Sequence, residues 1–186
     1  RVLTGHYIPA LIMDALSKVA PQRVLAGAGS PIWCVNISGT NEKGIPITGL
    51  FFFNGGMGAS AQADGLSCVS WPSNISSTSA EEIENRLPVR ILKRALRKNS
   101  GGVGKHNGGD GQIVELEYTG VTDGVLAFLA DRIKTPAKGL SGGGDGAMGI
   151  LKINGQVIDP KMQHIIPPGS LITLATPGGG GYGTSL

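Results

Sequence analysis

The stretch NGGMGASAQADGLSCVSWPSN, residues 54–74, constrains the fold of this chain more than any other part of the sequence. It combines glycines and small polar residues with a single carboxylate, that of Asp64. Glycine has no side chain to clash and tolerates positive φ, so such a run lets the backbone approach a ligand or another chain segment closely. Further glycine-rich segments follow at 101–111, 139–149 and 177–183.

The composition is that of a folded protein with an excess of glycine. Of 186 residues, 31 are glycine, against a usual share of about 7%. Apolar residues make up 40% and charged residues 16%, so the chain can bury a core and is not expected to be disordered. Glycine excess with ordinary hydrophobicity indicates many tight turns between strands, and the length fits one domain or a large piece of one.

The apolar pattern predicts an α+β fold that is predominantly β. An amphipathic helix is expected over 8–20, with Pro9 in its first turn. A short helix is expected over 79–86, because Ser79 and Glu82 have the spacing of a capping box. Glycine-rich turns connect strands predicted at 33–38, 47–53, 89–98, 113–118, 125–130, 150–153 and 171–175.

Three details of the strands lead to specific expectations. The first two strands are expected to form a hairpin, and the triple phenylalanine at 51–53 suggests burial on both faces. Glu115 and Glu117 are expected to pair with basic residues of the strand over 89–98. We treat residues 1–186 as a single unit, with an α/β part over 1–88 and a mostly β part over 89–186.

The charge pattern excludes some classes of partner. Net charge is +3, but seven basic residues and no acid lie between Arg86 and Lys105. This run is a solvated strand face, a contact for an acidic partner protein, or a site for a polyanion. It lacks the aromatic residues that stack on bases, so nucleic acid is not expected as a partner. No apolar run reaches the roughly 18 residues of a membrane span.

Known ligand motifs do not fit the glycine-rich segments. Residues 101–106 lack both the first glycine and the final Ser or Thr of a phosphate-binding P-loop. Two GxGxxG matches, at 144–149 and 178–183, precede a strand-like segment and the end of the sequence rather than a helix, so they are expected to be turns. Cys34 and Cys68 have no CxxC spacing and are expected to be free thiols in a reducing compartment, hence a cytoplasmic location.

Two side chains stand out as candidate catalytic groups. His6 follows Thr4 and Gly5 directly before the predicted helix, where it could act as an acid, a base or an anion contact. Asp64 either caps a turn through its own backbone or provides a pocket carboxylate. The histidines have no partner at zinc-type spacing, so no metal ligand is assigned.

Taken together, several motifs resemble the B-type subunits of ATP-dependent hydantoinases and oxoprolinases, which have relatives among ATP-dependent ketone carboxylases. Individually each motif is weak, whereas their order and spacing over nearly the whole chain are specific. They are Thr4-Gly5-His6, Gly55 to Ala59, Asp64-Gly65 with Ser67 and Ser70, Pro72-Ser73-Asn74, Glu81 to Pro88, Ser100 to Gly104 with Gly108-Gly109, and Thr176 to Gly183.

The resemblance implies that this chain is the carboxy-terminal third of a B-type subunit in a cytoplasmic hetero-oligomer. An A-type partner would bind ATP and Mg and phosphorylate a small-molecule substrate, and the B-type subunit would complete the ring opening of this cyclic amide. The family's divalent metal would be held by its amino-terminal part, so this chain would bind no cofactor itself. The substrate-pocket loop would comprise Asn54, Gly55, Gly56, Gly58, Ser73 and Asn74, beside the catalytic candidates His6 and Asp64.

Two alternatives remain open at this stage. The complex could be an ATP-dependent ketone carboxylase, or this chain could be a non-catalytic module that docks the rest of the B-type subunit and its partner. The second alternative is motivated by the lack of a complete catalytic set in the sequence.

Overall fold

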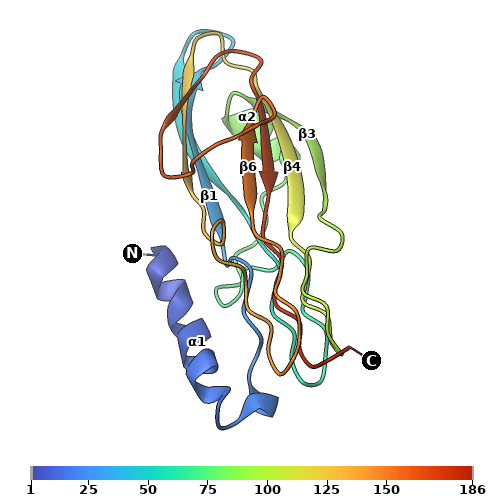
Figure 1. Ribbon diagram of the computed structural model, residues 1–186. Helices are drawn as coiled ribbons and strands as arrows, with labels where there is room; N and C mark the ends of the chain where they lie inside the picture. Colours follow the sequence, from blue (N-terminus) through green and yellow to red (C-terminus); the bar gives the residue numbers. More distant parts are fainter. Residues whose placement is uncertain (1, 186) are drawn as a thin grey trace.

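Two antiparallel β-sheets form the body of the protein, with helix α1 (Val2–Leu16) beside them (Figure 1). The computed structural model describes residues 2–185. The four-stranded sheet has the order β2 (Pro46–Phe53), β1 (Trp33–Thr40), β5 (Gly124–Leu129), β8 (His164–Ile166). The five-stranded sheet has the order β3 (Val89–Leu96), β4 (Gln112–Tyr118), β9 (Leu171–Ala175), β6 (Ile150–Ile153), β7 (Gln156–Val157). The predicted α+β class with predominant β structure is confirmed.

The hydrophobic core lies between the two sheets. Alternate residues of β4 are buried, as expected for a strand with one face on a core. Val114 and Leu116 of that strand belong to one cluster with Val35 and Ile37 of β1 and with Trp33, which is fully buried. Burial of each such side chain stabilises the fold by roughly 1.5–3 kcal/mol.

Most strand predictions are confirmed, and the exceptions have simple reasons. The hairpin of β1 and β2 has the register Trp33↔Phe53. Burial of the triple phenylalanine on both faces was wrong, because β2 is an edge strand and Phe52 is half-buried while Phe51 and Phe53 lie in the core. The prediction missed β7 and β8, which have only two and three residues and thus no clear period.

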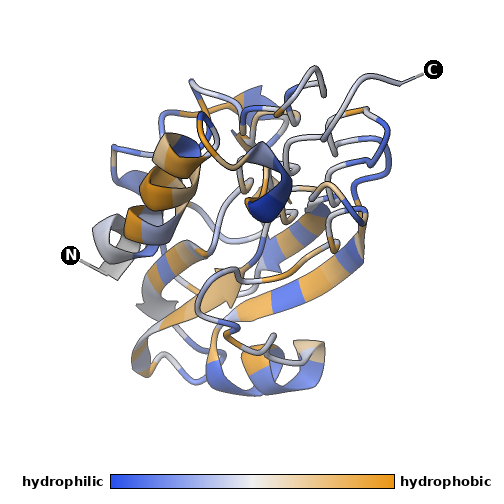
Figure 2. Cartoon of the chain, turned by 90° about the horizontal axis from the view of Figure 1, so that it is seen from below, coloured by the Kyte–Doolittle hydropathy of each residue, from blue (hydrophilic) through white to orange (hydrophobic). Residues whose placement is uncertain are grey.

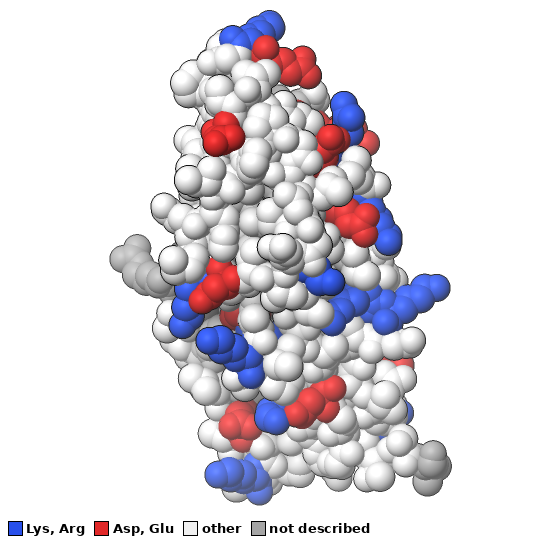
Figure 3. Space-filling model, turned by 45° about the horizontal axis from the view of Figure 1, so that its top comes forward, with Lys and Arg blue, Asp and Glu red and all other residues white. Residues whose placement is uncertain are grey.

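The positive charge of the basic strand β3 is balanced in part by glutamates of its neighbour β4. Lys93 pairs with Glu115 and Arg90 with Glu117, each with an N–O distance of 3.5 Å. Figure 3 shows basic and acidic side chains gathered along the right side, where β3 and β4 lie. The expected cross-strand pairing is therefore confirmed, although exposed pairs of this kind contribute at most about 1 kcal/mol.

The two helices contrast in how well the sequence predicts them. Helix α2 (Ala80–Arg86) begins as expected, with Ser79 Oγ accepting a hydrogen bond from the Glu82 backbone N–H at 3.3 Å. The first helix was predicted over 8–20, but α1 begins at Val2 and ends at Leu16, and Pro9 lies inside it. Proline removes only the hydrogen bond to the carbonyl of Gly5, four residues earlier, so the remaining bonds allow the helix to continue through it.

Below the sheets, glycine-rich segments from distant parts of the chain run beside one another (Figure 1). The segment at 177–182 lies at their centre. The N–H groups of Gly179, Gly180 and Gly181 donate to the carbonyls of Gly109, Gly27 and Gly144, at 2.9, 2.8 and 2.9 Å. Three successive amides thus reach three different segments of the chain. We call the segments that these and similar backbone hydrogen bonds join, residues 26–30, 54–59, 100–111, 137–147 and 177–182, the glycine array.

Glycine is required in the array because neighbouring backbones occupy the space of a Cβ. A Cβ at Gly179 would lie 2.0 Å from the carbonyl oxygen of Met57, and one at Gly56 would lie 1.7 Å from that of Gly109. Only part of the glycine content belongs to turns with positive φ, which the described residues show at Gly44, Gly142, Gly155, Gly169 and Gly183. Close backbone approach therefore accounts for much of the unusual composition.

Replacing a central array glycine should destabilise the protein strongly. Gly179→Ala places a methyl group against backbone that cannot rotate away, so we expect a loss of about 3 kcal/mol or more in the free energy of unfolding. Gly5→Ala is the matched control, because a Cβ there has no neighbour within 4 Å and alanine favours a helix by roughly 0.5–1 kcal/mol. Urea denaturation measures both, and a Gly179→Ala change comparable to the control would contradict this account.

Candidate functional site

Asp131, directly after β5, is the most unusual ionisable residue in the structure. Its Oδ1 accepts a hydrogen bond from Ser30 Oγ and another from Trp33 Nε1 at 3.2 Å. The Trp33 indole also donates to the Asp131 backbone carbonyl at 3.1 Å. Asp131 Oδ2 is buried and has no hydrogen-bond partner among the described residues. The carboxyl group is thus fixed through one oxygen, and the other is unsatisfied.

The environment of Asp131 favours its protonated form. Burial raises the pKa of Asp131 to about 7, although the nearby Arg132 charge and a backbone hydrogen bond act in the opposite direction. A buried carboxyl loses hydration when it ionises, which explains the direction of this pKa shift. Carboxyl groups with a pKa near neutrality in a cleft are candidates for functional sites, because they can take up or release a proton at working pH.

Arg132 presents a constrained cation beside this carboxyl. Its backbone has a φ of 56°, which is uncommon for a residue with a side chain. The guanidinium carbon lies 5.4 Å from the centre of the Tyr7 ring, and Nη1 donates to the Pro136 carbonyl at 3.1 Å. Its Nε is buried without a partner among the described residues. Burial lowers the pKa of Arg132, an effect that Asp131 opposes.

Tyr7 and Arg132 line two clefts of the protein. One has a volume of about 380 Å³ and also contains Asp131. The other has a volume of about 220 Å³ and includes Trp71 and Lys138. The cluster of Tyr7, Asp131 and Arg132 therefore places a carboxyl group of raised pKa and a cation among the residues of one cleft, a combination that marks a candidate functional site.

The structure places the predicted catalytic residue His6 within α1 rather than before it. Its Nδ1 is buried and has no partner among the described residues. It adjoins Tyr7 in sequence, so it belongs to the helix that borders the two clefts. A catalytic role for His6 stays a prediction.

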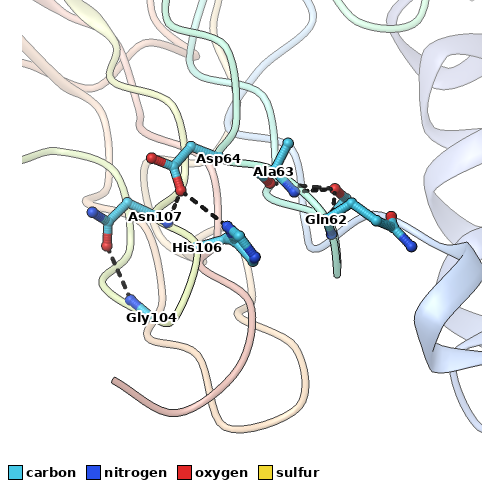
Figure 4. Close-up of polar contacts among 7 residues, drawn as sticks. Gln62, Ala63, Asp64, Gly104, His106 and Asn107 are labelled. Atoms are coloured by element: carbon cyan, nitrogen blue, oxygen red, sulfur yellow. Dashed lines mark hydrogen bonds and ion pairs between the residues drawn. The ribbon is translucent and has the colours of Figure 1, made fainter. Parts of the chain in front are cut away.

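Asp64, the second catalytic candidate, lies on a separate loop (Figure 4). Its Oδ1 accepts from the Asn107 backbone N–H at 2.9 Å and lies 3.5 Å from His106 Nδ1. Asn107 Oδ1 in turn accepts from the Gly104 N–H at 3.1 Å. Asp64 thus joins its own loop to residues 104–107 rather than capping its own turn, and 65% of its side chain is exposed.

The predicted pocket-loop glycines lie inside the glycine array. Gly55, Gly56 and Gly58 are buried, and a Cβ on any of them would meet backbone atoms within 2.6 Å. Asn54 is also buried, and its carbonyl accepts from Gln112 Nε2 at 3.0 Å and from Thr176 Oγ1 at 2.9 Å. These glycines do allow a close approach, as the sequence indicated, but the approaching group is the backbone of other segments. Contact of this loop with substrate stays a prediction.

Ser73 and Asn74 lie in an exposed loop after Trp71. Ser73 Oγ is 3.0 Å from Ser70 Oγ, and Asn74 has a φ of 52°. The structure therefore does not bring the predicted residues together into one site: His6 lies on α1 next to the cleft residue Tyr7, Asp64 lies on its own loop, and the glycines are internal.

Asp131 and Arg132 were missed because their sequence signal is weak. They are an acidic and a basic residue that follow, after Ala130, a strand with alternating burial. Nothing in the local sequence shows that Ser30 and Trp33, about a hundred residues away, donate hydrogen bonds to the Asp131 carboxyl group. That information exists only in the folded chain.

Residues 2–185 show no arrangement of side chains that would bind a metal ion. No group of three or more His, Cys, Asp or Glu side chains in that range is placed to hold a metal ion. Among the same residues, no helix combines the length and the apolar character needed to cross a membrane. The structure also describes both cysteines as free, and burial raises the pKa of each thiol.

Comparisons with known proteins extend over nearly the whole chain. The profile of the family described as Hydantoinase B/oxoprolinase matches residues 1–185. A protein of Pseudomonas sp. (strain NS671), named as the B-type subunit of a D-/L-hydantoinase, is 30% identical over all of this chain, which spans 32% of that relative. 5-Oxoprolinase 1 of Arabidopsis thaliana is 35% identical over 71% of this chain and 11% of its own length.

Two solved structures share the fold. The nucleotide-free structure of acetone carboxylase matches 90% of this chain and 28% of its own, with a TM-score of 0.75 and 20% identity. The ATP-dependent caprolactamase of Pseudomonas jessenii matches 92% of this chain and 32% of its own, with a TM-score of 0.69 and 24% identity. The chain thus corresponds to about a third of these larger polypeptides.

Asp131 should make the stability of the protein depend on pH. Its folded pKa is about 7 against an ordinary value of 3.8, so its stabilising contribution is complete below about pH 4 and is lost as the pH rises through 7. We expect the stability advantage of the wild type over Asp131→Asn to shrink by about 2–3 kcal/mol between pH 5 and 8, because the folded pKa of about 7 lies well above pH 5. Urea denaturation across this range is the measurement, and a constant difference would show that the carboxyl titrates normally.

Proposed function

Because the chain belongs to the Hydantoinase B/oxoprolinase family, we propose that it is part of the B-type subunit of an ATP-dependent cyclic amide hydrolase. In this proposal an A-type partner phosphorylates the substrate, and the B-type subunit completes the ring opening. The family match over residues 1–185 carries the proposal. The two free cysteines agree with a cytoplasmic, reducing location.

The glycine array supports the assignment of ATP binding to a partner. A phosphate-binding loop directs free backbone N–H groups toward its ligand. In this protein, the N–H groups of Gly102, Gly144 and Gly181 already donate to the carbonyls of Gly179, Val103 and Gly144. These segments, which superficially match nucleotide-binding motifs, therefore have their amides engaged within the array. A partner that holds ATP and Mg agrees with this arrangement.

Helix α1 supports the further proposal that the remainder of the B-type subunit covers this side of the protein. Ile8, Leu11 and Ile12 are 56%, 66% and 54% exposed, and Figure 2 shows hydrophobic residues in successive turns of the helix. The opposite side contacts the body, where Met13 Sδ accepts from the Leu25 N–H at 3.4 Å. A helix that is apolar on both sides is typical of a buried position. In this role the chain also acts as a docking module.

Ketone carboxylation is the second candidate, favoured by the fold shared with acetone carboxylase. At 20% identity this likeness concerns the fold alone. The relatives at 30% and 35% identity are instead named for hydantoinase and 5-oxoprolinase. We therefore place the cyclic amide first.

A substrate panel distinguishes the two functions. The complete B-type subunit, assembled with its A-type partner, should hydrolyse a cyclic amide such as hydantoin, 5-oxoproline or a larger lactam in an ATP-dependent manner. Turnover is followed by the appearance of the ring-opened acid, ADP and inorganic phosphate. Consumption of a ketone that requires ATP and bicarbonate, without lactam hydrolysis, would establish the carboxylase instead.

Removal of His6 tests its predicted catalytic role in the assembled complex. An acid, base or anion contact typically contributes 10²-fold or more to turnover, so His6→Ala should lower kcat by about that factor. Assembly and the thermal transition should stay unchanged. Lys18→Ala, on the turn after the same helix, serves as the control. Unchanged turnover for His6→Ala would remove His6 from the site.

A further inference from the structure

We propose that the cleft between α1 and the chain after β5 binds the carboxylate of a small organic anion, through Asp131 Oδ2 and Arg132 Nε. The cleft has a volume of about 380 Å³ and is lined in part by Tyr7, Asp131, Arg132, Lys134, Asp159 and Lys161. This inference goes beyond the proposed activity and does not rest on it. It follows from two buried polar atoms without partners on adjacent residues that line one space.

The first of the two groups is held in place by residues outside the cleft. Ser30 Oγ and Trp33 Nε1 both donate to Asp131 Oδ1, so the carboxyl cannot turn without losing two hydrogen bonds. Its Oδ2 is buried and has no partner among residues 2–185. Leaving a buried polar atom unpaired costs about 1–3 kcal/mol. A ligand that satisfies this atom recovers that free energy.

The second group is oriented just as firmly. Tyr7 packs against the Arg132 guanidinium, and the Pro136 carbonyl accepts from its Nη1. Arg132 Nε is left as a buried donor without a partner in the described part of the chain. Arg132 also has an uncommon backbone φ of 56°, and such backbone strain clusters at ligand-binding sites.

The surrounding charges favour an anion. Arg132, Lys134 and Lys161 provide three cations, while the carboxylates of the cleft are Asp131 and Asp159. Asp159 Oδ1 accepts a hydrogen bond from the Lys161 backbone N–H at 3.0 Å, so this oxygen already has a partner within its own turn. From α1 the cleft receives Tyr7, which adjoins His6 in the sequence.

Protonation of Asp131 distinguishes a carboxylate from other ligands. Burial raises the pKa of Asp131 to about 7, so near neutral pH a large fraction of the group carries a proton. The protonated group donates from Oδ2, and with Arg132 Nε it offers two donors to the two oxygens of a carboxylate. Once Asp131 ionises, it repels the anion. A neutral amide such as acetamide would accept from Arg132 Nε through its carbonyl and donate an N–H to Oδ2, so it would prefer the ionised form of Asp131.

Titration with small probes tests the proposal. Trp33 donates to Asp131, so its fluorescence reports on the site; Trp71→Phe removes the other tryptophan. The probes are acetate, acetamide and inorganic phosphate at constant ionic strength. Acetate should bind saturably, and its Kd should rise about tenfold per pH unit above 7. Tighter binding of acetamide with affinity that rises with pH, tighter binding of phosphate, or no saturable signal would overturn the proposal.

Variants assign the effect to the two residues. In Asp131→Asn, the amide nitrogen can still donate, so acetate binding should persist without its pH dependence. Arg132→Gln should weaken acetate binding at least tenfold. Lys98→Gln, on the exposed loop after β3, is the charge-matched control and should change the Kd less than twofold. An unaltered Kd in Arg132→Gln, or an unaltered pH profile in Asp131→Asn, would contradict the proposal, and the urea midpoint of each variant verifies folding.

Discussion

Direct contact between backbones in the glycine array is the constraint on which the rest of the structure depends. Each segment of the array supplies hydrogen bonds to several neighbours, and the contacts leave no space for a Cβ. The segments come from loops at the ends of both sheets, so the array joins the two sheets outside their shared core. The same principle applies in collagen, where only glycine fits at the crowded axis.

The array also determines the position of the candidate site. Gly27 and Gly29 donate to the carbonyls of Lys138 and Gly56, and the Ser30 carbonyl accepts from Gly55. These bonds fix the segment that carries Ser30 and leads into Trp33, and those two side chains hold Asp131. Gly149 contributes in another way, because a Cβ there would lie 2.2 Å from the Trp33 ring. Features that look like flexible loops in the sequence thus serve to position a carboxyl group.

How much the sequence predicts depends on the range of each interaction. The Ser79 cap and the β1–β2 hairpin are local, and the sequence predicts both. The start of α1 was misplaced because Pro9 was treated as a boundary. The array was not predicted, since the neighbours of each glycine lie far away in the sequence: Gly179 contacts Met57 and Gly109. The burial of Asp131 depends on the same distant contacts, which explains why the sequence pointed to His6 and Asp64 and missed this site.

Amide hydrogen exchange at Gly179, Gly180 and Gly181, followed by NMR in the intact protein, tests the central claim most directly. Ordinary glycine loops exchange quickly, because their backbone is exposed and opens at little cost. If these three amides are bonded within a packed array, they should exchange as slowly as the amides of β1 and β4 in the core. Exchange as fast as that of the exposed turn residue Gly155 would contradict the account.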